Sequence, residues 1–184
     1  MTMSTQVWAG GLGRRERLVR DRVWSVATVA ARPGAVQVER TEDGLRVGVG
    51  DEPGWGGRRT WVVLRRDGSV SVDAPSTPPA LLVSSTAART LPAVPGVPER
   101  IGMDPGERLL VLSSDALDVL PESVVSVLQS LPDRVTGKDP VDLLAELFEG
   151  LPSGSGVIVT RRPAPVPVAG SDQEEATWGS AQRS

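Results

Sequence analysis

The stretch from Asp104 to Arg162 constrains the fold of this chain most, because it predicts a buried strand, two helices and a closing strand in succession. Residues 107–113 include four consecutive apolar residues and are entered through the Pro-Gly pair at 105–106. A short apolar run bounded by such a turn is typical of a strand that is buried on both faces. Residues 156–161 then return as the closing strand.

Two helices are predicted between these strands. Pro121 begins the first, because its missing N–H costs nothing in the first turn of a helix, and Pro132 ends it. Asp139 caps the second helix, Pro140 occupies its first position and Gly150 ends it. Both segments carry apolar residues at helical spacing, so each helix is expected to turn one face inward.

Two hairpins are predicted in the first half of the chain. Residues 35–40 and 45–49 alternate apolar with polar or small residues around the Asp-Gly pair at 43–44. This pair accepts the positive φ angles of a tight hairpin turn. Residues 61–64 and 69–73 flank a second turn in the same way. Because a hairpin alone is not stable, both need a sheet and a hydrophobic partner layer.

These elements predict an α+β fold. Further strands are expected at 24–30 and 80–83, whereas the rest of 74–98 is rich in proline and predicted to be loop. The core is therefore expected to be a largely antiparallel β-sheet, with the two C-terminal helices between the last strands. The chain has 184 residues, enough for one domain with a real core.

The domain boundaries follow from composition. Residues 1–13 are expected to be loosely ordered, and residues 14–162 to form a single domain. Residues 163–184 begin with alternating prolines and continue with Ser, Gln, Glu and Gly. Such a segment buries too little apolar surface to order itself, so we expect a disordered Pro-rich and acidic tail.

Composition also excludes several classes of function. The chain contains no cysteine and no histidine, which removes disulfides, Ser-His-Asp and Cys-His pairs and the usual zinc ligands. The formal net charge is -3, so no global basic field recruits nucleic acid. Residues 14–22 hold five arginines, which we interpret as a solvated face rather than a nucleic-acid patch. No segment is apolar enough to span a membrane, and we expect a cytoplasmic protein.

Three stretches resemble motifs of the PPM-type (protein phosphatase 2C-like) serine/threonine phosphatases, and of their SpoIIE-like branch in particular. Residues 42–56 are similar to a family motif whose Gly-Asp presents a metal-binding carboxylate at a strand end. Residues 105–117 resemble a second motif, whose Thr-Asp-Gly supplies another metal ligand. Residues 139–163 resemble the last motif. The resemblance implies that the strands at 107–113 and 156–161 are antiparallel neighbours.

The chain also departs from the family pattern. The family's opening acidic motif is not found, and its Gly-His-Gly corresponds to Gly-Trp-Gly at 54–56. The terminal acidic pair of the family is replaced by Ser and Gly at 153–156, and the two long helices expected after the glycine-rich loop are missing. The resemblance therefore implies a shortened and degenerate relative.

Only Asp51 and Asp115 match metal-ligand positions of the family. A two-metal phosphatase site needs several carboxylates to balance its charge, so we assign no catalytic residue and predict no cofactor. Mg²⁺ or Mn²⁺ is the expected ion if one binds. The alternative, which we favour, is that Asp51 is a turn residue and Asp115 a turn or capping acid. The distance between the two carboxyl groups separates these interpretations.

The glycine-rich loop at 50–57 and the arginines after it form the candidate partner-binding surface. Trp55, Arg58 and Arg59 have the composition of interface anchors. In the alternative interpretation Trp55 packs over the sheet edge. We predict another protein as the partner; neither a membrane nor a nucleic acid is expected, and the oligomeric state is not predicted.

Three functions are consistent with these observations. The favoured one is a catalytically degenerate phosphatase-like domain that acts as a regulatory or protein-binding module. The second is an active Mg²⁺- or Mn²⁺-dependent phosphoserine/phosphothreonine phosphatase that uses Asp51, Asp115 and a further acid such as Asp118 or Glu52. The third is an unrelated small α+β interaction domain.

Overall fold

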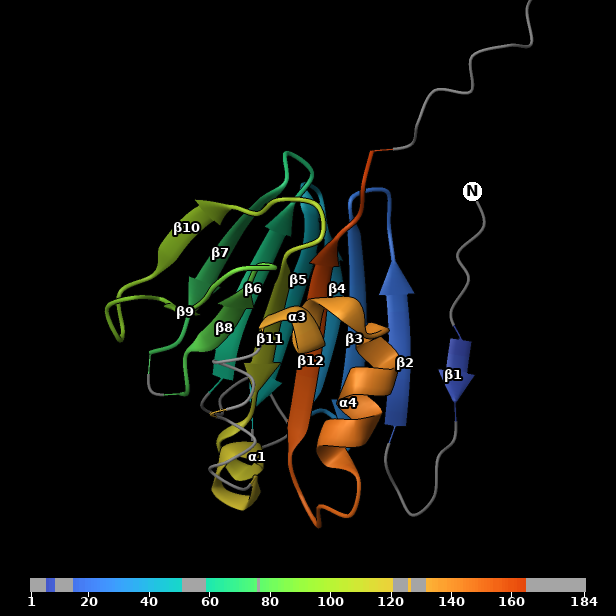
Figure 1. Cartoon of the computed structure of the whole chain (residues 1–184). Coiled ribbons are helices and arrows are strands. Elements are labelled where there is room, and N and C mark those ends of the chain that lie inside the picture. The colour runs from blue at the N-terminus through green and yellow to red at the C-terminus, as the bar shows by residue number, and fades with distance from the viewer. Residues whose placement is uncertain are drawn as a thin grey trace, which may run out of the picture.

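The computed structural model describes residues 6–8, 15–50, 59–75, 77–120, 126 and 132–164. Figure 1 shows two layers of strands with the helices lying against one of them. The strands are β1 (Gln6–Trp8), β2 (Arg15–Arg20), β3 (Trp24–Ala30), β4 (Val36–Thr41), β5 (Gly44–Gly50), β6 (Arg59–Arg65), β7 (Ser69–Asp73), β8 (Ala80–Val83), β9 (Ala88–Leu91), β10 (Glu99–Gly102), β11 (Arg108–Leu112) and β12 (Ser155–Arg161). The helices are α1 (Ser114–Val119), α3 (Pro132–Gly137) and α4 (Pro140–Phe148).

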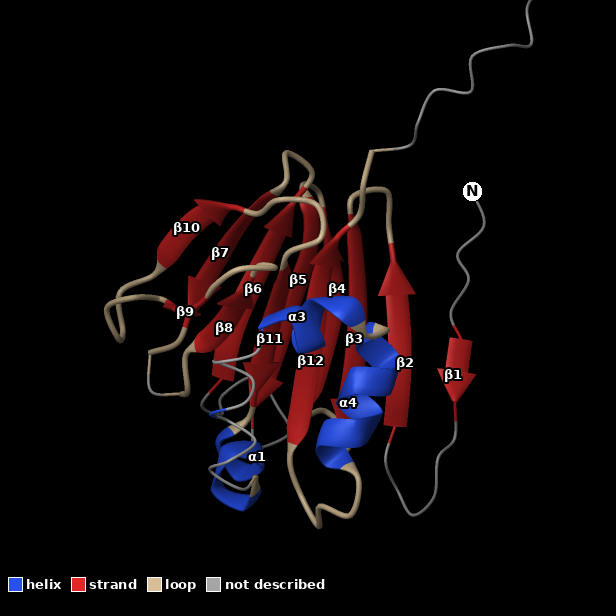
Figure 2. Ribbon diagram, viewed as in Figure 1, coloured by secondary structure: helices blue, strands red, loops and turns tan. Residues whose placement is uncertain are grey.

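Within the described residues the strands form two sheets (Figure 2). Sheet A has seven strands in the order β1-β2-β3-β12-β11-β8-β9, and sheet B has five in the order β10-β7-β6-β5-β4. The strand pairs in both sheets are antiparallel. The predicted α+β fold with a largely antiparallel core is confirmed.

The main core lies between the two sheets. Val47 and Val62 of sheet B and Leu109 and Val159 of sheet A are all 0% exposed and belong to one apolar cluster. From Thr60 onward in β6, and throughout β7, the buried residues alternate with half-buried ones, as expected for strands with one face toward a core. Each layer therefore supplies the partner surface that neither hairpin has alone.

Both predicted hairpins are present. β4 pairs with β5 around the turn at 42–43, and β6 pairs with β7 around the turn at 66–68. Gly44 is required at the first turn, because a Cβ atom added there would lie 2.0 Å from the carbonyl oxygen of Leu64. The Asp-Gly signal in the sequence thus marks a place where two backbones approach closely.

The late strand pair that the family resemblance requires is also present. β11 and β12 are antiparallel neighbours, with Val111 opposite Val157. They occupy the centre of sheet A, between β8 and β3. All five residues of β11 are buried, which confirms the prediction of a strand covered on both faces.

The helices cover the outer face of sheet A. Leu144 and Phe148 of α4 pack in a second apolar cluster with Leu110 of β11 and Ile158 of β12. The side chain of Asp139 accepts a hydrogen bond from the Val141 amide at 2.8 Å, so the predicted N-cap of α4 is confirmed. Pro132, which was predicted to end the first helix, begins α3, where a proline is tolerated in the first turn; the end of the predicted first helix stays a prediction. Most of the predicted helix that begins at Pro121 lies outside the described residues.

Four strands differ from the prediction. β9 lies where a loop was predicted, and β10, β1 and β2 were not predicted at all. β9 and β10 are the outer strands of their sheets and alternate poorly: only Leu91 in β9 and Ile101 in β10 are large and apolar. A short edge strand needs few apolar residues, so its sequence resembles that of a loop. Among the described residues, no helix is long and apolar enough to cross a membrane.

Candidate functional site

The candidate site lies at the end of the sandwich where β3, β5 and β11 finish and β12 begins. The amide of Gly50, the last residue of β5, donates to the Ala35 carbonyl at 3.0 Å. The Ala31 amide, just after β3, donates to the Ser155 hydroxyl at 3.4 Å. These contacts bring the end of β5, the β3–β4 loop and the start of β12 to the same end. We call residues 31–35, 50, 113–115 and 155 the site end.

Ser113 holds the site end together. Its backbone amide donates to the Ser155 carbonyl at 2.9 Å, and its hydroxyl accepts from the Ser155 amide at 3.0 Å. The same hydroxyl accepts from the Ala116 amide at 3.3 Å and is the N-cap of α1. A side chain that is 2% exposed thereby joins the end of β11, the beginning of β12 and the first turn of α1.

Asp115 lies in the first turn of α1, where the positive end of the helix dipole favours a carboxylate. Its Oδ2 is 3.9 Å from Nη2 of Arg32, in the β3–β4 loop. The Arg32 and Asp115 side chains are 59% and 34% exposed, so solvent screens the pair. The position that the family resemblance assigns to a metal ligand therefore has a guanidinium as a neighbour. A divalent ion at this carboxylate would be repelled by the arginine.

Arg59 is the second arginine at this end, opposite Gly50 in the β5–β6 pair. It is 2% exposed, its Nη2 donates to the Gly34 carbonyl at 2.7 Å, and burial lowers its pKa. Arg59 was predicted to be part of a partner-binding surface. Its guanidinium holds the β3–β4 loop inside the protein, and its part in that surface stays a prediction. A buried guanidinium needs a hydrogen-bond acceptor such as the Gly34 carbonyl, because burial without one is costly.

The other predicted site residues divide into two groups. Asp51, Glu52, Trp55 and Arg58 lie outside the described residues, so the predicted metal pair and the rest of the partner surface stay predictions. Asp118 lies on α1 and is exposed. Among the described residues, no three acidic side chains are grouped as a metal site would need.

Two residues of the site end were missed in the sequence. Ser113 carried a signal: a serine two residues before an aspartate, at the end of a buried strand, is typical of a helix start. Arg32 carried none, because its contact with Asp115 joins segments that are far apart in the chain.

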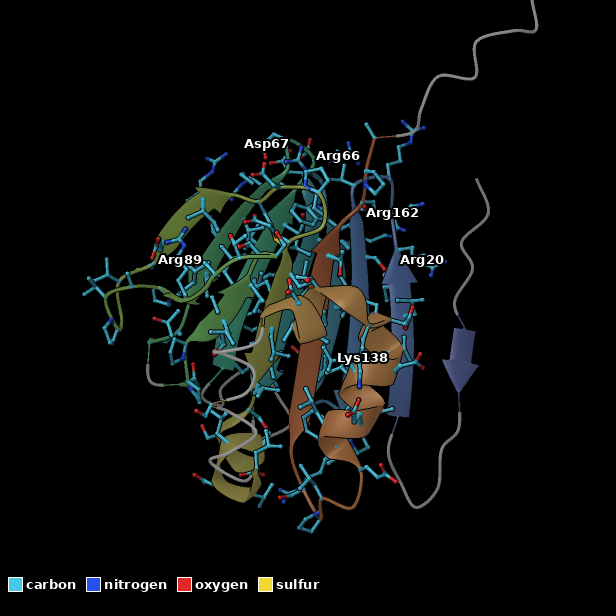
Figure 3. The ribbon with its side chains drawn as sticks, in the orientation of Figure 1. Arg20, Arg66, Asp67, Arg89, Lys138 and Arg162 are labelled. Carbon is cyan, nitrogen blue, oxygen red and sulfur yellow. The ribbon has the colours of Figure 1, made fainter. Side chains whose placement is uncertain are left out.

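Arg20, from the arginine-rich stretch at 14–22, lies at the other end of the molecule (Figure 3). In Figure 3, Arg20, Arg66 and Arg162 are at the end of the molecule away from α1, and the acidic Asp67 is beside Arg66. The guanidinium of Arg162 donates to the Asp21 carbonyl. Charges of both signs are mixed at this end, as on an ordinary solvated surface.

No protein-family model and no curated protein sequence matches the chain. Solved structures that are similar include the PP2C phosphatase domain with a regulatory fragment of SpoIIE from Bacillus subtilis, with a TM-score of 0.43 and 11% identity over 88% of this chain and 64% of that one. RsbX in complex with magnesium has a TM-score of 0.48 and 7% identity, over 79% of this chain and 98% of that one. The PPM Ser-Thr phosphatase MsPP from Mycobacterium smegmatis has a TM-score of 0.43 and 12% identity, over 89% and 99%.

These neighbours are PPM-type phosphatases, and at such identities the likeness concerns the fold alone. The chain spans about two thirds of the SpoIIE chain, 64%. The antiparallel pairing of β11 with β12 is the strand pairing that the sequence resemblance requires.

Proposed function

We propose that this chain is a catalytically degenerate PPM-phosphatase-like domain that acts by binding another protein rather than by hydrolysis. The observation that carries the proposal is the ion pair between Arg32 and Asp115. It gives the one described candidate metal ligand a protein cation as neighbour. The same aspartate also has a structural role at the start of α1.

The chemistry of a two-metal phosphatase supports this interpretation. Two divalent ions held close together need several carboxylates around them, together with a water that attacks the phosphorus. The candidate ligands of this chain are two aspartates, and the site end adds Arg32 and the buried Arg59. The Arg32 guanidinium beside Asp115 disfavours a cation at that carboxylate, and solvent weakens the effect because both side chains are partly exposed.

A surface suited to protein binding lies on the β9–β10 loop. Val94 and Val97 are 60% and 56% exposed, the large exposed apolar side chains of the described residues. The loop is held by Glu99, which accepts from the Ala93 amide at 2.7 Å and pairs with Arg89 at 3.2 Å. Figure 3 shows Arg89 at the side of the molecule that carries β9. Because these contacts already hold the loop, its exposed valines would lose little conformational entropy on binding a partner.

Hydrolysis of para-nitrophenyl phosphate with Mg²⁺ and with Mn²⁺ tests the proposal. We expect no metal-dependent turnover by the intact chain, by Asp115→Asn or by the control Asp118→Asn on the same helix. Calorimetry should show weak Mn²⁺ binding that strengthens in Arg32→Ala, since that variant removes the competing cation. Mn²⁺-dependent turnover that is lost in Asp115→Asn and kept in Asp118→Asn would instead establish an active phosphatase.

A further inference from the structure

The outer face of sheet B, turned away from the core, carries an unusual set of side chains. Val36 and Val38 of β4, the buried apolar side chains of β5, β6 and β7, and the half-buried Ile101 of β10 pack inward. By strand alternation the residues between them point outward. We define the outer face of sheet B by Gln37, Glu39, Arg46, Gly48, Trp61, Val63, Arg65, Ser69, Ser71, Asp73 and Arg100.

β6 is apolar on both of its faces. Val62 and Leu64 are 0% exposed in the core, whereas Trp61 and Val63 are half-buried on the outer face. A continuous apolar run of this kind is typical of a strand that is covered on both sides. The described helices pack in the cluster on sheet A, and in Figure 1 they lie on that side of the sandwich. No described helix covers the outer face of sheet B.

The indole ring of Trp61 is fixed by contacts with two residues of β5. The ring lies against β5, over the backbone of Gly48. A Cβ atom added at Gly48 would be 2.7 Å from Cζ3 of the ring, so glycine leaves the room that the ring occupies. The Cζ atom of Arg46 is 3.9 Å from the ring centroid, so its guanidinium stacks on the indole. Tryptophan and arginine dominate the energetic centres of protein interfaces, and a rigid ring loses little entropy on binding.

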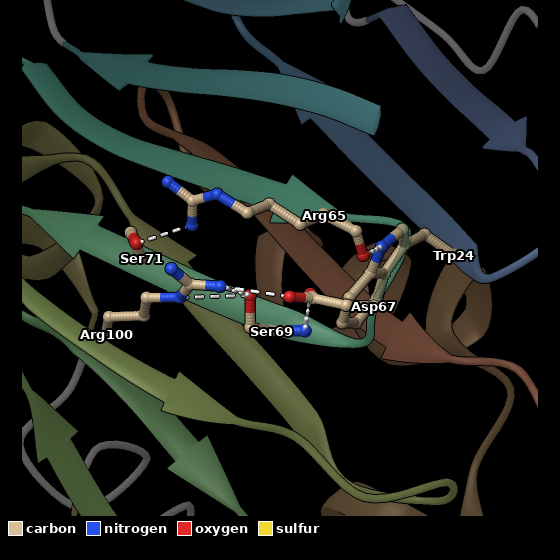
Figure 4. A network of polar contacts seen from close by, with 6 residues as sticks. All are labelled: Trp24, Arg65, Asp67, Ser69, Ser71 and Arg100. Carbon is tan, nitrogen blue, oxygen red and sulfur yellow. Dashed lines mark hydrogen bonds and ion pairs between the residues drawn. The ribbon is translucent and has the colours of Figure 1, made fainter. Parts of the chain in front are cut away.

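The charges on this face are ordered across the sheet. One cross-strand row runs Glu39, Arg46, Val63, Ser71, Arg100, with an acid on one edge strand and a base on the other. Arg100 is fixed on the face by its contacts with Asp67 at 2.9 Å and Ser69 at 3.0 Å, and Arg65 donates to Ser71 at 2.8 Å (Figure 4). In a face-to-face pair, the two-fold axis lies between the two sheets, parallel to β6 and above it. A half-turn about this axis places β4 of one copy over β10 of the other. Glu39 then faces Arg100 twice, across a centre formed by Trp61 and Val63.

We propose that the outer face of sheet B binds a second copy of this chain, in a two-fold, face-to-face dimer centred on β6. The charge order across the row is self-complementary in this arrangement and favours a second copy over an unrelated partner. Five strands spaced by about 4.8 Å, each about 20 Å long, give a flat footprint of roughly 500 Å² per copy. That size is at the small end of specific interfaces, so the dimer is expected to dissociate on dilution.

Sedimentation velocity of the full chain over a range of concentrations tests the dimer. We expect a concentration-dependent dimer whose Kd rises by about tenfold or more in Trp61→Ala, in Glu39→Arg and in Arg100→Glu, since each removes apolar contact or creates like-charge contacts. Val94→Asp, on the β9–β10 loop, is the control that leaves the Kd unchanged. Circular dichroism checks that each variant is folded, and Arg46→Glu replaces any that is not.

Mixing the two charge variants gives the decisive result. Glu39→Arg alone places arginine against Arg100 at both contacts, and Arg100→Glu alone places glutamate against Glu39. An equal mixture pairs arginine with glutamate at both contacts, so native mass spectrometry should show mainly the mixed dimer. Any of four results would overturn the proposal. The protein could be a monomer at all concentrations, or its dimer could be insensitive to Trp61→Ala. The dimer could instead be weakened by Val94→Asp, or the mixture of charge variants could contain no mixed dimer. None of these outcomes depends on the phosphate-ester assay.

Discussion

Replacement of Ser113 by alanine is expected to destabilise the domain more than its small size suggests. The hydroxyl accepts two hydrogen bonds, from the Ala116 amide at the start of α1 and from the Ser155 amide at the start of β12. Ser113→Ala removes both acceptors without a change in backbone geometry. The two losses are not equal, because their donors differ in what else they bind.

The Ala116 amide also donates to the Ser113 carbonyl at 3.1 Å, so loss of the cap costs only about 0.5 kcal/mol, the low end for N-caps. Ser155 is 2% exposed, and its amide loses the hydroxyl acceptor. A buried donor left without a partner costs about 2 kcal/mol. The expected loss in the free energy of unfolding is therefore about 2 to 3 kcal/mol, most of it from the strand amide.

Urea unfolding followed by circular dichroism and tryptophan fluorescence measures this loss. The matched control is Ser114→Ala, because the neighbouring serine is only half-buried and no hydrogen bond of its side chain is seen among the described residues. The control should stay within about 0.5 kcal/mol of the parent protein. Ser113→Thr keeps the hydroxyl and should recover part of the loss. A loss below about 1 kcal/mol in Ser113→Ala, or one equal to the control's, would refute the role of the Ser155 amide.

Two further predictions concern backbone geometry and pH. Gly154→Ala should lower the free energy of unfolding by more than about 3 kcal/mol, and Gly150→Ala by only about 1 to 2, as measured by urea unfolding. Both glycines have positive φ, but only at Gly154 would a Cβ atom lie 2.7 Å from the Cα of Ala116; equal losses would contradict this reasoning. Hydrogen bonds from Ser69, its side chain first and then its amide, lower the pKa of Asp67 from 3.8. A carboxylate whose pKa is lower in the folded than in the unfolded protein stabilises the fold at pH values above its unfolded-state pKa. Asp67→Asn should therefore be less stable than the parent protein at neutral pH, and the difference in the free energy of unfolding should shrink below about pH 4. A gap that widens in acid would contradict the assignment.

Several elements were predictable from local patterns. The Asp-Gly pair at 43–44 and the alternation around it predicted the first hairpin, and the Asp139 and Pro140 pair predicted the start of α4. The apolar runs of β11 and β12 predicted buried strands, and the motif resemblance predicted their antiparallel pairing. The hairpin turn and the helix start depend on residues that are close together in the chain. The two late strands are buried on both faces, so each has a continuous apolar run that the sequence shows directly.

The edge strands and the first turn of α1 were harder. β9 and β10 each bury little apolar surface, so nothing in their composition separates them from the proline-rich loop between them. α1 is not among the predicted helices, because a helix of six residues that follows a strand directly shows little helical periodicity. Ser113 carries a local signal for a helix start, but its second hydrogen bond, from the Ser155 amide of β12, joins segments that are far apart in the sequence.

The sequence by itself determined the central strands, the hairpin turns, the strongest helix and the loss of most metal-ligand positions of the family motifs, because these depend on periodicity, turn chemistry and residue identity. The tertiary structure alone decided that Arg32 meets Asp115, that Arg59 is buried beneath the β3–β4 loop and that Trp61 lies flat on Gly48. Such contacts arise where sheets pack and strands align, and a local pattern carries no information about which distant side chain arrives there. The site end and the outer face of sheet B are therefore properties of the packed sandwich.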